Sequence, residues 1–239
     1  NDHVNMGQSS NDVIPTAIKI SAHIDLTKKL YPALDKLINE IQTKAKSLQG
    51  VTKTGRTHLM DAMPIDFSDE LLAWSSQLSA CRNMLEVIEE RFLELPQGGT
   101  AVGSGINAHK QFAKFFAQEM SKILETKRKY IPSNNFFHEL SAQDCSVQLS
   151  GELKNLAVIL MKISNDLRWM NSGPLAGLSE IELQALQPGS SIMPGKVNPV
   201  IPEAVTMVSA DVIGNDTSIT VAAQAGNFQL NVMLPVIAY

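Results

Sequence analysis

Residues 67–95 read FSDELLAWSSQLSACRNMLEVIEERFLEL. The apolar side chains of this stretch recur at alternating steps of four and three residues, at Phe67, Leu71, Trp74, Leu78, Cys81, Leu85, Ile88, Phe92 and Leu95. Such spacing is a heptad repeat, which places one continuous apolar stripe along a helix. The stretch therefore predicts a helix of about 30 residues, roughly 45 Å long.

Two other parts of the chain carry the same pattern. Residues 26–48 repeat it until Gly50, and residues 153–170 repeat it until Gly173 and Pro174. A shorter helix is predicted over residues 111–124, and another from Pro202 into the 220s. The predicted fold class is therefore all-α. Helices of this length cannot bury their whole stripes in one domain of 239 residues, so we expect an elongated bundle that packs on copies of itself.

Composition narrows the range of functions. The net charge is -4 and no basic run occurs, which argues against a nucleic-acid partner and against docking on an anionic membrane. No apolar run is long enough for a membrane span, and the first residues lack a signal-peptide core. Two cysteines and five scattered histidines give no metal-ligand spacing, so we expect no metal and no cofactor. We therefore expect a cytoplasmic protein, and we interpret the chain as a fragment because both ends read as interior sequence.

Polar residues gather in segments that interrupt the helices, where functional groups are most often found. Ser9, Ser10 and Asn11 precede a predicted helix, so they fit either an N-cap cluster or an anion site at a helix N-terminus. Residues 54–64, TGRTHLMDAMP, predict a polar loop between two long helices, and residues 51–59, VTKTGRTHL, predict a short extended piece within this region. Residues 97–109 are rich in glycine, which predicts close backbone approach, with Thr100, Ser104 and Asn107 as helix caps.

Residues 189–204, GSSIMPGKVNPVIPEA, combine prolines and glycines with two serines, a lysine and an asparagine. The prolines and glycines predict a bent, stiff loop. An ordinary crossover loop would explain the prolines, but it would not explain Ser190, Ser191, Lys196 and Asn198 together. Glu203 is predicted in the first turn of a helix, where the helix dipole stabilises a carboxylate.

In these polar segments the chain resembles the class II fumarate hydratases of the fumarase/aspartase superfamily. GSSIMPGKVNP resembles the signature of the superfamily. Five other segments resemble segments of the class II fumarate hydratases and follow one another in the same order as in those enzymes: NDHVN, QSSND, GRTHLMDAMP, GGTAVGSGIN and MKISNDLRWMNSGP. The likeness covers essentially the whole chain. Aspartase carries glutamine where this chain has His58, so the histidine favours fumarase.

The resemblance implies a tetramer with a core of twenty helices and active sites built from three subunits. It also implies that residues 1–10 end a preceding N-terminal domain. Residues 11–239 would form the central helical-bundle domain, without the N-terminal and C-terminal domains of the family.

The resemblance also implies roles for individual residues. Ser190 resembles the base that removes the C3 proton of malate, and His58 resembles the second acid/base group, with Glu203 as its partner. The residues that resemble the substrate-carboxylate shell are Ser9, Ser10, Asn11, Thr57, Ser191, Lys196, Val197 and Asn198. Asn1 and Asp2 match the end of a motif for a second, non-catalytic dicarboxylate site.

The chemistry expected from the resemblance suits these residue types. Removal of a proton beside a carboxylate creates an aci-carboxylate dianion, which cationic and amide donors stabilise. Lys196 and loop amides supply such donors without a metal. Two alternatives remain open at this point: an aspartate ammonia-lyase, and a helical assembly module without turnover.

Overall fold

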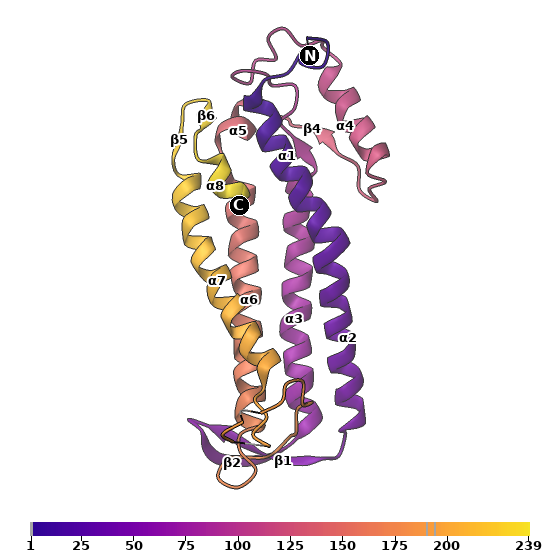
Figure 1. Ribbon diagram of the computed structural model, residues 1–239. Helices are drawn as coiled ribbons and strands as arrows, with labels where there is room; N and C mark the ends of the chain where they lie inside the picture. The colour runs from indigo at the N-terminus through magenta and orange to yellow at the C-terminus, as the bar shows by residue number, and fades with distance from the viewer. Residues whose placement is uncertain (1, 190, 194) are drawn as a thin grey trace. The chain divides into compact units, whose positions relative to one another are not determined.

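The computed structural model describes residues 2–189, 191–193 and 195–239, and it is all-α in class, with only short strands. Figure 1 labels the elements. The α-helices are α1 (Ser10–Asp25), α2 (Tyr31–Ser47), α3 (Phe67–Glu89), α4 (Phe112–Ile123), α5 (Phe136–Ser141), α6 (Asp144–Met170), α7 (Val200–Ala223) and α8 (Leu234–Ala238). The strands are β1 (Thr52–Thr57), β2 (Met60–Asp66), β3 (Glu94–Leu95), β4 (Ile131–Pro132), β5 (Gly226–Asn227) and β6 (Leu230–Asn231). They pair as β1–β2, β3–β4 and β5–β6.

The chain divides into two compact units. The first holds residues 2–39, Arg82–Glu152 and Asp216–Tyr239, and the second holds Glu40–Cys81 and Leu153–Asn215. No helix in the described part of the chain is long and apolar enough to cross a membrane.

The heptad stripe that begins at Phe67 is confirmed as core. Leu78 and Leu85 are fully buried, and Trp74 is nearly so. The helix is shorter than predicted, because α3 ends at Glu89 and a 3₁₀ turn, Glu90–Phe92, follows it. Leu95 is buried as predicted, but it lies in strand β3, whose partner is β4. Periodicity alone cannot separate a last helical turn from a short buried strand.

The stripe over residues 26–48 is partly wrong. A π-helix at Leu26–Leu30 joins α1 to α2, and Figure 1 shows the ribbon of α1 continuing into α2. A π-turn inserts a residue into the helical repeat and so rotates the positions that follow. Leu34 and Ala45 of the predicted stripe are buried beyond the π-helix, and so is Tyr31, whereas Leu37, also in that stripe, is 38% exposed. The third stripe is confirmed, since Leu156, Ile163 and Met170 are buried on α6.

In the first unit, a polar pair and a histidine lie within the core. Lys19 on α1 donates its ammonium protons to the carbonyl oxygens of Arg91 and Glu94, at 3.1 and 2.8 Å, and pairs with the Glu139 carboxylate. Lys19 is only 4% exposed, so these bonds replace the water that a lysine normally keeps.

His23 is the second buried polar group of this unit. Its Nδ1 lies 2.7 Å from the Tyr130 hydroxyl and its Nε2 lies 3.3 Å from Oε1 of Glu89. This arrangement suits the neutral ring that donates from Nε2 to the carboxylate and accepts at Nδ1 from the phenol. Burial lowers the pKa of His23 below 6.5, although the Glu89 carboxylate opposes the shift. Burial, together with Glu89, raises the pKa of Tyr130 to about 12.

Stability should therefore fall on acidification. Below a pH of about 6.5 the unfolded chain binds a proton at His23 while the folded chain does not, so the free energy of unfolding declines until the lowered folded pKa is reached. Urea denaturation between pH 5 and pH 8 measures this slope. We expect His23→Gln to flatten it, whereas the matched change at the exposed His109 should leave it unchanged. An unchanged slope in His23→Gln would contradict the assignment.

Candidate functional site

The structure distributes the predicted site residues over both units. Ser9, Ser10, Asn11 and Asp2 belong to the first unit. Thr57, His58, Ser191, Lys196, Val197, Asn198 and Glu203 belong to the second. Asn1 and Ser190, the predicted base, lie outside the described residues.

At the start of α1, Ser9 is the N-cap. Its hydroxyl oxygen accepts from the Asn11 amide at 3.2 Å, and Oδ1 of Asp12 accepts from the Ser9 amide at 2.9 Å. These reciprocal bonds form a capping box, so the N-cap interpretation of this segment is confirmed. Ser10 is exposed in the first turn of α1.

Asp12 was missed by the sequence interpretation. It is fully buried, and its Oδ2 accepts from the amides of Gly98 and Thr100 at 3.0 and 2.9 Å. Asn11 donates its side-chain amide to the carbonyl oxygen of Ala101 at 2.8 Å. The glycine-rich segment is thus fastened to the start of α1. The only sequence signal for Asp12 was its position three residues after the N-cap Ser9, where a capping box has an acidic or amide side chain.

The glycine-rich segment allows close packing, as predicted, but its predicted helix caps are wrong. A Cβ on Gly103 would lie 2.8 Å from the Phe137 nitrogen, which leaves no room for a side chain. Helix α4 begins later, after Gln111, which is its N-cap. Thr100 and Asn107 instead take positive φ angles of 58° and 63°.

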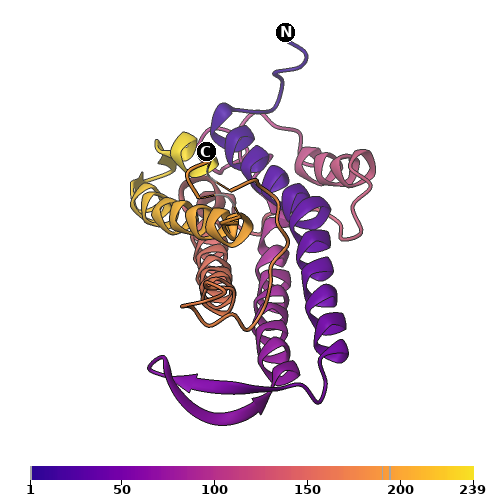
Figure 2. The same ribbon diagram turned by 60° about the horizontal axis from the view of Figure 1, so that its bottom comes forward.

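In the second unit, the predicted polar loop is wrong, because residues 54–64 fall in an antiparallel β-hairpin, whereas the short extended piece predicted over residues 51–59 is confirmed by β1. β1 and β2 are joined by a tight turn at His58 and Leu59, and Figure 2 shows the two strands extending side by side away from the ends of α2 and α3 that they connect. The register shifts by one residue between Thr54 and Arg56. A Cβ on Gly55 would meet the Met63 carbonyl oxygen at 2.7 Å, so glycine is required at this bulge.

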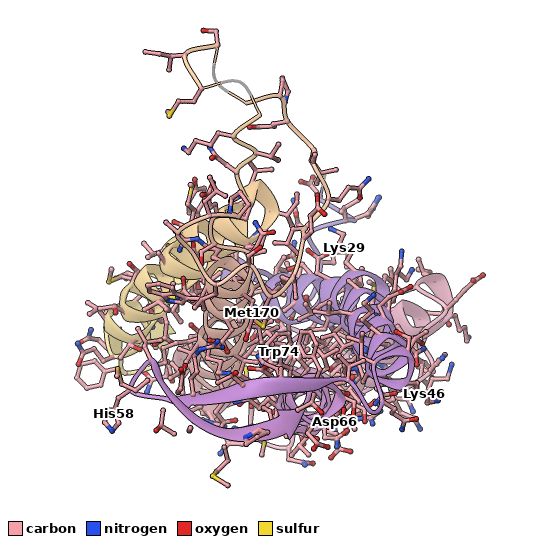
Figure 3. All side chains as sticks on the ribbon, turned by 90° about the horizontal axis from the view of Figure 1, so that it is seen from below. Lys29, Lys46, His58, Asp66, Trp74 and Met170 are labelled. Atoms are coloured by element: carbon pink, nitrogen blue, oxygen red, sulfur yellow. The ribbon has the colours of Figure 1, made fainter. Side chains whose placement is uncertain are left out.

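The hairpin turn has an unusual backbone. His58 and Leu59 have φ angles of 55° and 59°, which suit the two central residues of a type I′ turn. Asparagine and glycine usually hold these positions, and a leucine there is strained. Strain of this kind collects at functional sites. Figure 3 shows His58 at the free end of the hairpin, far from Trp74 and Met170 in the same unit.

Removing this strain should stabilise the protein. The Leu59 side chain is 64% exposed, so Leu59→Gly loses little burial and relieves the left-handed conformation. We expect the free energy of unfolding to rise by up to about 1 kcal/mol, as measured by urea denaturation. Leu59→Ala, which keeps a Cβ, is the control and should not stabilise. Equal behaviour of the two variants would contradict the strain argument.

A cavity of about 760 Å³ lies among the end of α6, the segment that follows it and the first turn of α7. Four predicted residues, Lys196, Val197, Asn198 and Glu203, line this cavity. Sequence reasoning missed its other polar side chains, which belong to Asn165, Arg168, Asn171, Ser172, Ser179 and Glu182.

Both cationic and anionic side chains line the cavity. Arg168 and Lys196 bring two positive charges, and Glu182 and Glu203 bring two carboxylates. Glu203 lies in the first turn of α7, as predicted. The arrangement can hold a small anion at the cations while a carboxylate remains nearby to orient a proton donor.

His58 and Thr57 do not line this cavity. Among the described residues, no hydrogen bond or ion pair joins His58 to Glu203, so their predicted partnership stays a prediction. Likewise, no cluster of three potential metal ligands occurs within residues 2–189, 191–193 and 195–239.

Residues 1–214 match the family model described as Lyase. A match over most of the chain shows the family, and the chain therefore belongs to this family of lyases.

Individual relatives of the chain carry names that are more specific than the description of the family. The chain is 58% identical over 238 residues to "Fumarate hydratase class II 2" of Pseudomonas aeruginosa, covering 100% of the chain and 52% of the relative. It is 48% identical over 239 residues to the class II fumarate hydratase of Campylobacter jejuni, covering 100% of the chain and 51% of the relative. Among solved structures it resembles the class II fumarase of Schistosoma mansoni, with a TM-score of 0.94 and 39% identity, over 100% of the chain and 52% of that structure. The chain thus spans about half the length of the curated relatives it matches.

Proposed function

We propose that this chain is the central part of a class II fumarate hydratase, which interconverts fumarate and malate by reversible addition of water. The observation that carries the proposal is the cavity in which Lys196, Asn198 and Glu203 meet, in a chain whose relatives carry that name. Residues 11–239 would then be the central domain, and residues 1–10 the end of the preceding one.

The reaction explains the residue types. In malate dehydration, Ser190 would take the C3 proton, and the electron pair left on C3 would delocalise into the neighbouring carboxylate. Lys196 and Asn198 would stabilise that dianion by charge and hydrogen bonding. The C2–O bond would then break as His58 gives a proton to the departing hydroxide, which leaves fumarate and water. Glu203 would hold the ring in its donating tautomer.

The substrate would be a small dicarboxylate. Two cations, Arg168 and Lys196, lie in one cavity, and a four-carbon dicarboxylate carries two negative charges. The volume of about 760 Å³ falls in the range of small-molecule sites. A volume larger than a four-carbon dicarboxylate needs supports a site that segments of other subunits complete.

The ultraviolet absorbance of fumarate tests this function. We expect the full-length protein, meaning this chain with the flanking sequence of its relatives, to form fumarate from malate and to consume fumarate in water. Aspartate is the discriminating substrate, because an aspartate ammonia-lyase would form fumarate from it. Turnover of aspartate alone would overturn the proposal, as would a well-folded full-length protein that turns over neither substrate. The 239-residue chain, assayed beside it, shows how much activity this part retains.

We also propose a cytoplasmic homotetramer with shared active sites. Apolar side chains are exposed on α7, where Met207 and Val208 are 69% and 63% exposed, and on the hairpin, where Met63 is 75% exposed. Contiguous apolar surface, rather than a single exposed side chain, marks a contact with another chain, and the neighbouring Met207 and Val208 on α7 support such a surface there.

Multi-angle light scattering tests the assembly. We expect a mass about fourfold that of the 26.1-kDa chain at micromolar concentration, because burial of these side chains favours closed symmetric oligomers. Met207→Glu and Val208→Glu should shift the mass towards the monomer, whereas the same change at the exposed Lys46 should not. A monodisperse monomer of wild-type chain would overturn the tetramer.

A further inference from the structure

The segment that leaves α6 folds back onto the end of that helix. The Glu180 amide donates to the carbonyl oxygen of Met170 at 2.8 Å, and the Ser179 amide donates to that of Ser172 at 2.9 Å. These bonds satisfy carbonyl groups that a helix C-terminus leaves without intrahelical partners. They also fix the backbone of Glu180, although it lies in no helix or strand.

The side chain of Glu180 does not line the cavity. Ser179, Ile181 and Glu182 all line it, and Glu180 does not. Its carboxylate instead meets the hairpin: Nη1 of Arg56 donates to Oε1 at 2.7 Å, and Nζ of Lys53 lies 3.4 Å from Oε2. Glu180 therefore has no direct contact with the proposed substrate cavity but does bind the hairpin that carries the proposed acid/base histidine.

The contact is more protected than a surface ion pair. The side chains of Lys53, Arg56 and Glu180 are 9%, 20% and 16% exposed. Partly buried charges are screened less by water and salt than exposed ones, and removing one partner leaves the other uncompensated. The pair should therefore hold its geometry.

Lys53 ties the same cluster to α3. Its ammonium pairs with the Glu70 carboxylate and lies 5.0 Å from the centre of the Phe67 ring. It also lies 3.3 Å from the sulfur of Met170. The base of the hairpin is thus fixed to α3 and to the end of α6, and among the described residues Glu180 is the carboxylate that pairs with both Lys53 and Arg56.

The hairpin needs such a contact. A two-stranded hairpin is marginally stable by itself, and this one ends in two residues with strained positive φ angles. Arg56 directly precedes Thr57 and His58, so a bond at Arg56 restricts the strand at the position beside them.

We propose that Glu180 is a positioning residue that fixes the β1–β2 hairpin, and with it Thr57 and His58, through Arg56 and Lys53. The proposal rests on the proposed function for its catalytic consequence, but the restraint on the hairpin can be measured without activity. An error of about 1 Å in the placement of a reacting group can reduce turnover roughly 100-fold, which gives the restraint a catalytic role.

Glu180→Gln in the full-length protein is the test, because it keeps the size and removes the charge. We expect kcat for malate dehydration to fall about 10- to 100-fold while KM changes less than about threefold, since Glu180 does not line the cavity. Hydrogen exchange read by mass spectrometry should show faster exchange in residues 52–66, with unchanged exchange in the buried part of α3. Asp166→Asn, which breaks the Lys162–Asp166 ion pair in the same unit without touching the hairpin, is the matched control.

A double-mutant cycle with Arg56→Gln separates positioning from general stability. If the two residues act as a pair, the double variant should be little slower than either single variant. Additive losses of kcat in the double variant would show that Glu180 and Arg56 do not act as a pair. If hydrogen exchange of residues 52–66 in Glu180→Gln is no faster than in Asp166→Asn, Glu180 does not restrain the hairpin. If the wild-type protein turns over no substrate, the proposed function fails, and hydrogen exchange alone decides whether Glu180 fixes the hairpin.

Discussion

Replacing His58 by asparagine is expected to lower malate dehydration by the full-length protein about 10²- to 10⁴-fold, the usual loss when a proton-transfer group is removed. The histidine is exposed at the turn of the hairpin and contributes to no buried stripe, so the fold should not change. Asparagine also tolerates the positive φ of 55°. The initial rate at saturating malate measures the loss.

The matched control is His109→Asn, since His109 is exposed and contributes to no proposed site. Its rate should equal that of the wild type. A His58→Asn variant that keeps more than about half of the wild-type turnover would remove His58 from the mechanism, because proton-transfer groups contribute far more than twofold.

Mixed oligomers test whether the sites are shared. Chains with Ser190→Ala and chains with His58→Asn should each be inactive alone. If the two residues of one site come from different subunits, exchange of subunits creates some sites with both groups intact, and activity reappears. If confirmed exchange restores nothing, each chain carries a complete site of its own.

Replacing Lys19 by methionine should destabilise the protein by about 3–5 kcal/mol, the cost of leaving the other half of a buried ion pair uncompensated. Lys19 and Glu139 are 4% and 8% exposed, and Lys19 also serves two backbone carbonyl groups that would lose their donor. Urea denaturation at pH 7 and a fixed protein concentration measures the free energy of unfolding.

Two further variants make this result specific. Lys122→Met breaks an exposed pair with Glu119 on α4 and should cost at most about 1 kcal/mol. Adding Glu139→Leu to Lys19→Met should recover much of the lost stability, because the uncompensated carboxylate is then removed. A loss below about 1 kcal/mol for Lys19→Met alone would show that this pair contributes little.

The sequence by itself determined the helices whose apolar stripes are regular. The stripe from Phe67 and the stripe ending at Met170 give α3 and α6, because the period of a helix is a local property. Gly173 and Pro174 also marked the end of α6 correctly, since neither residue continues a helix well. The lyase family was likewise readable from motifs, which are contiguous stretches of chain.

Only the tertiary structure decided where those helices deviate and how their polar segments are held. A π-helix at Leu26–Leu30 interrupts the α-helical repeat and Leu37 is partly exposed, although the sequence there keeps an unbroken apolar spacing. Residues 54–64 form a hairpin because β1 and β2 pair their backbone groups, whereas their side chains show no clean alternation of apolar and polar residues. The bond between Arg56 and Glu180 joins residues 124 positions apart. No local spacing predicts such a contact. It forms only because the segment that follows α6 folds back onto the C-terminal end of that helix and meets the hairpin there.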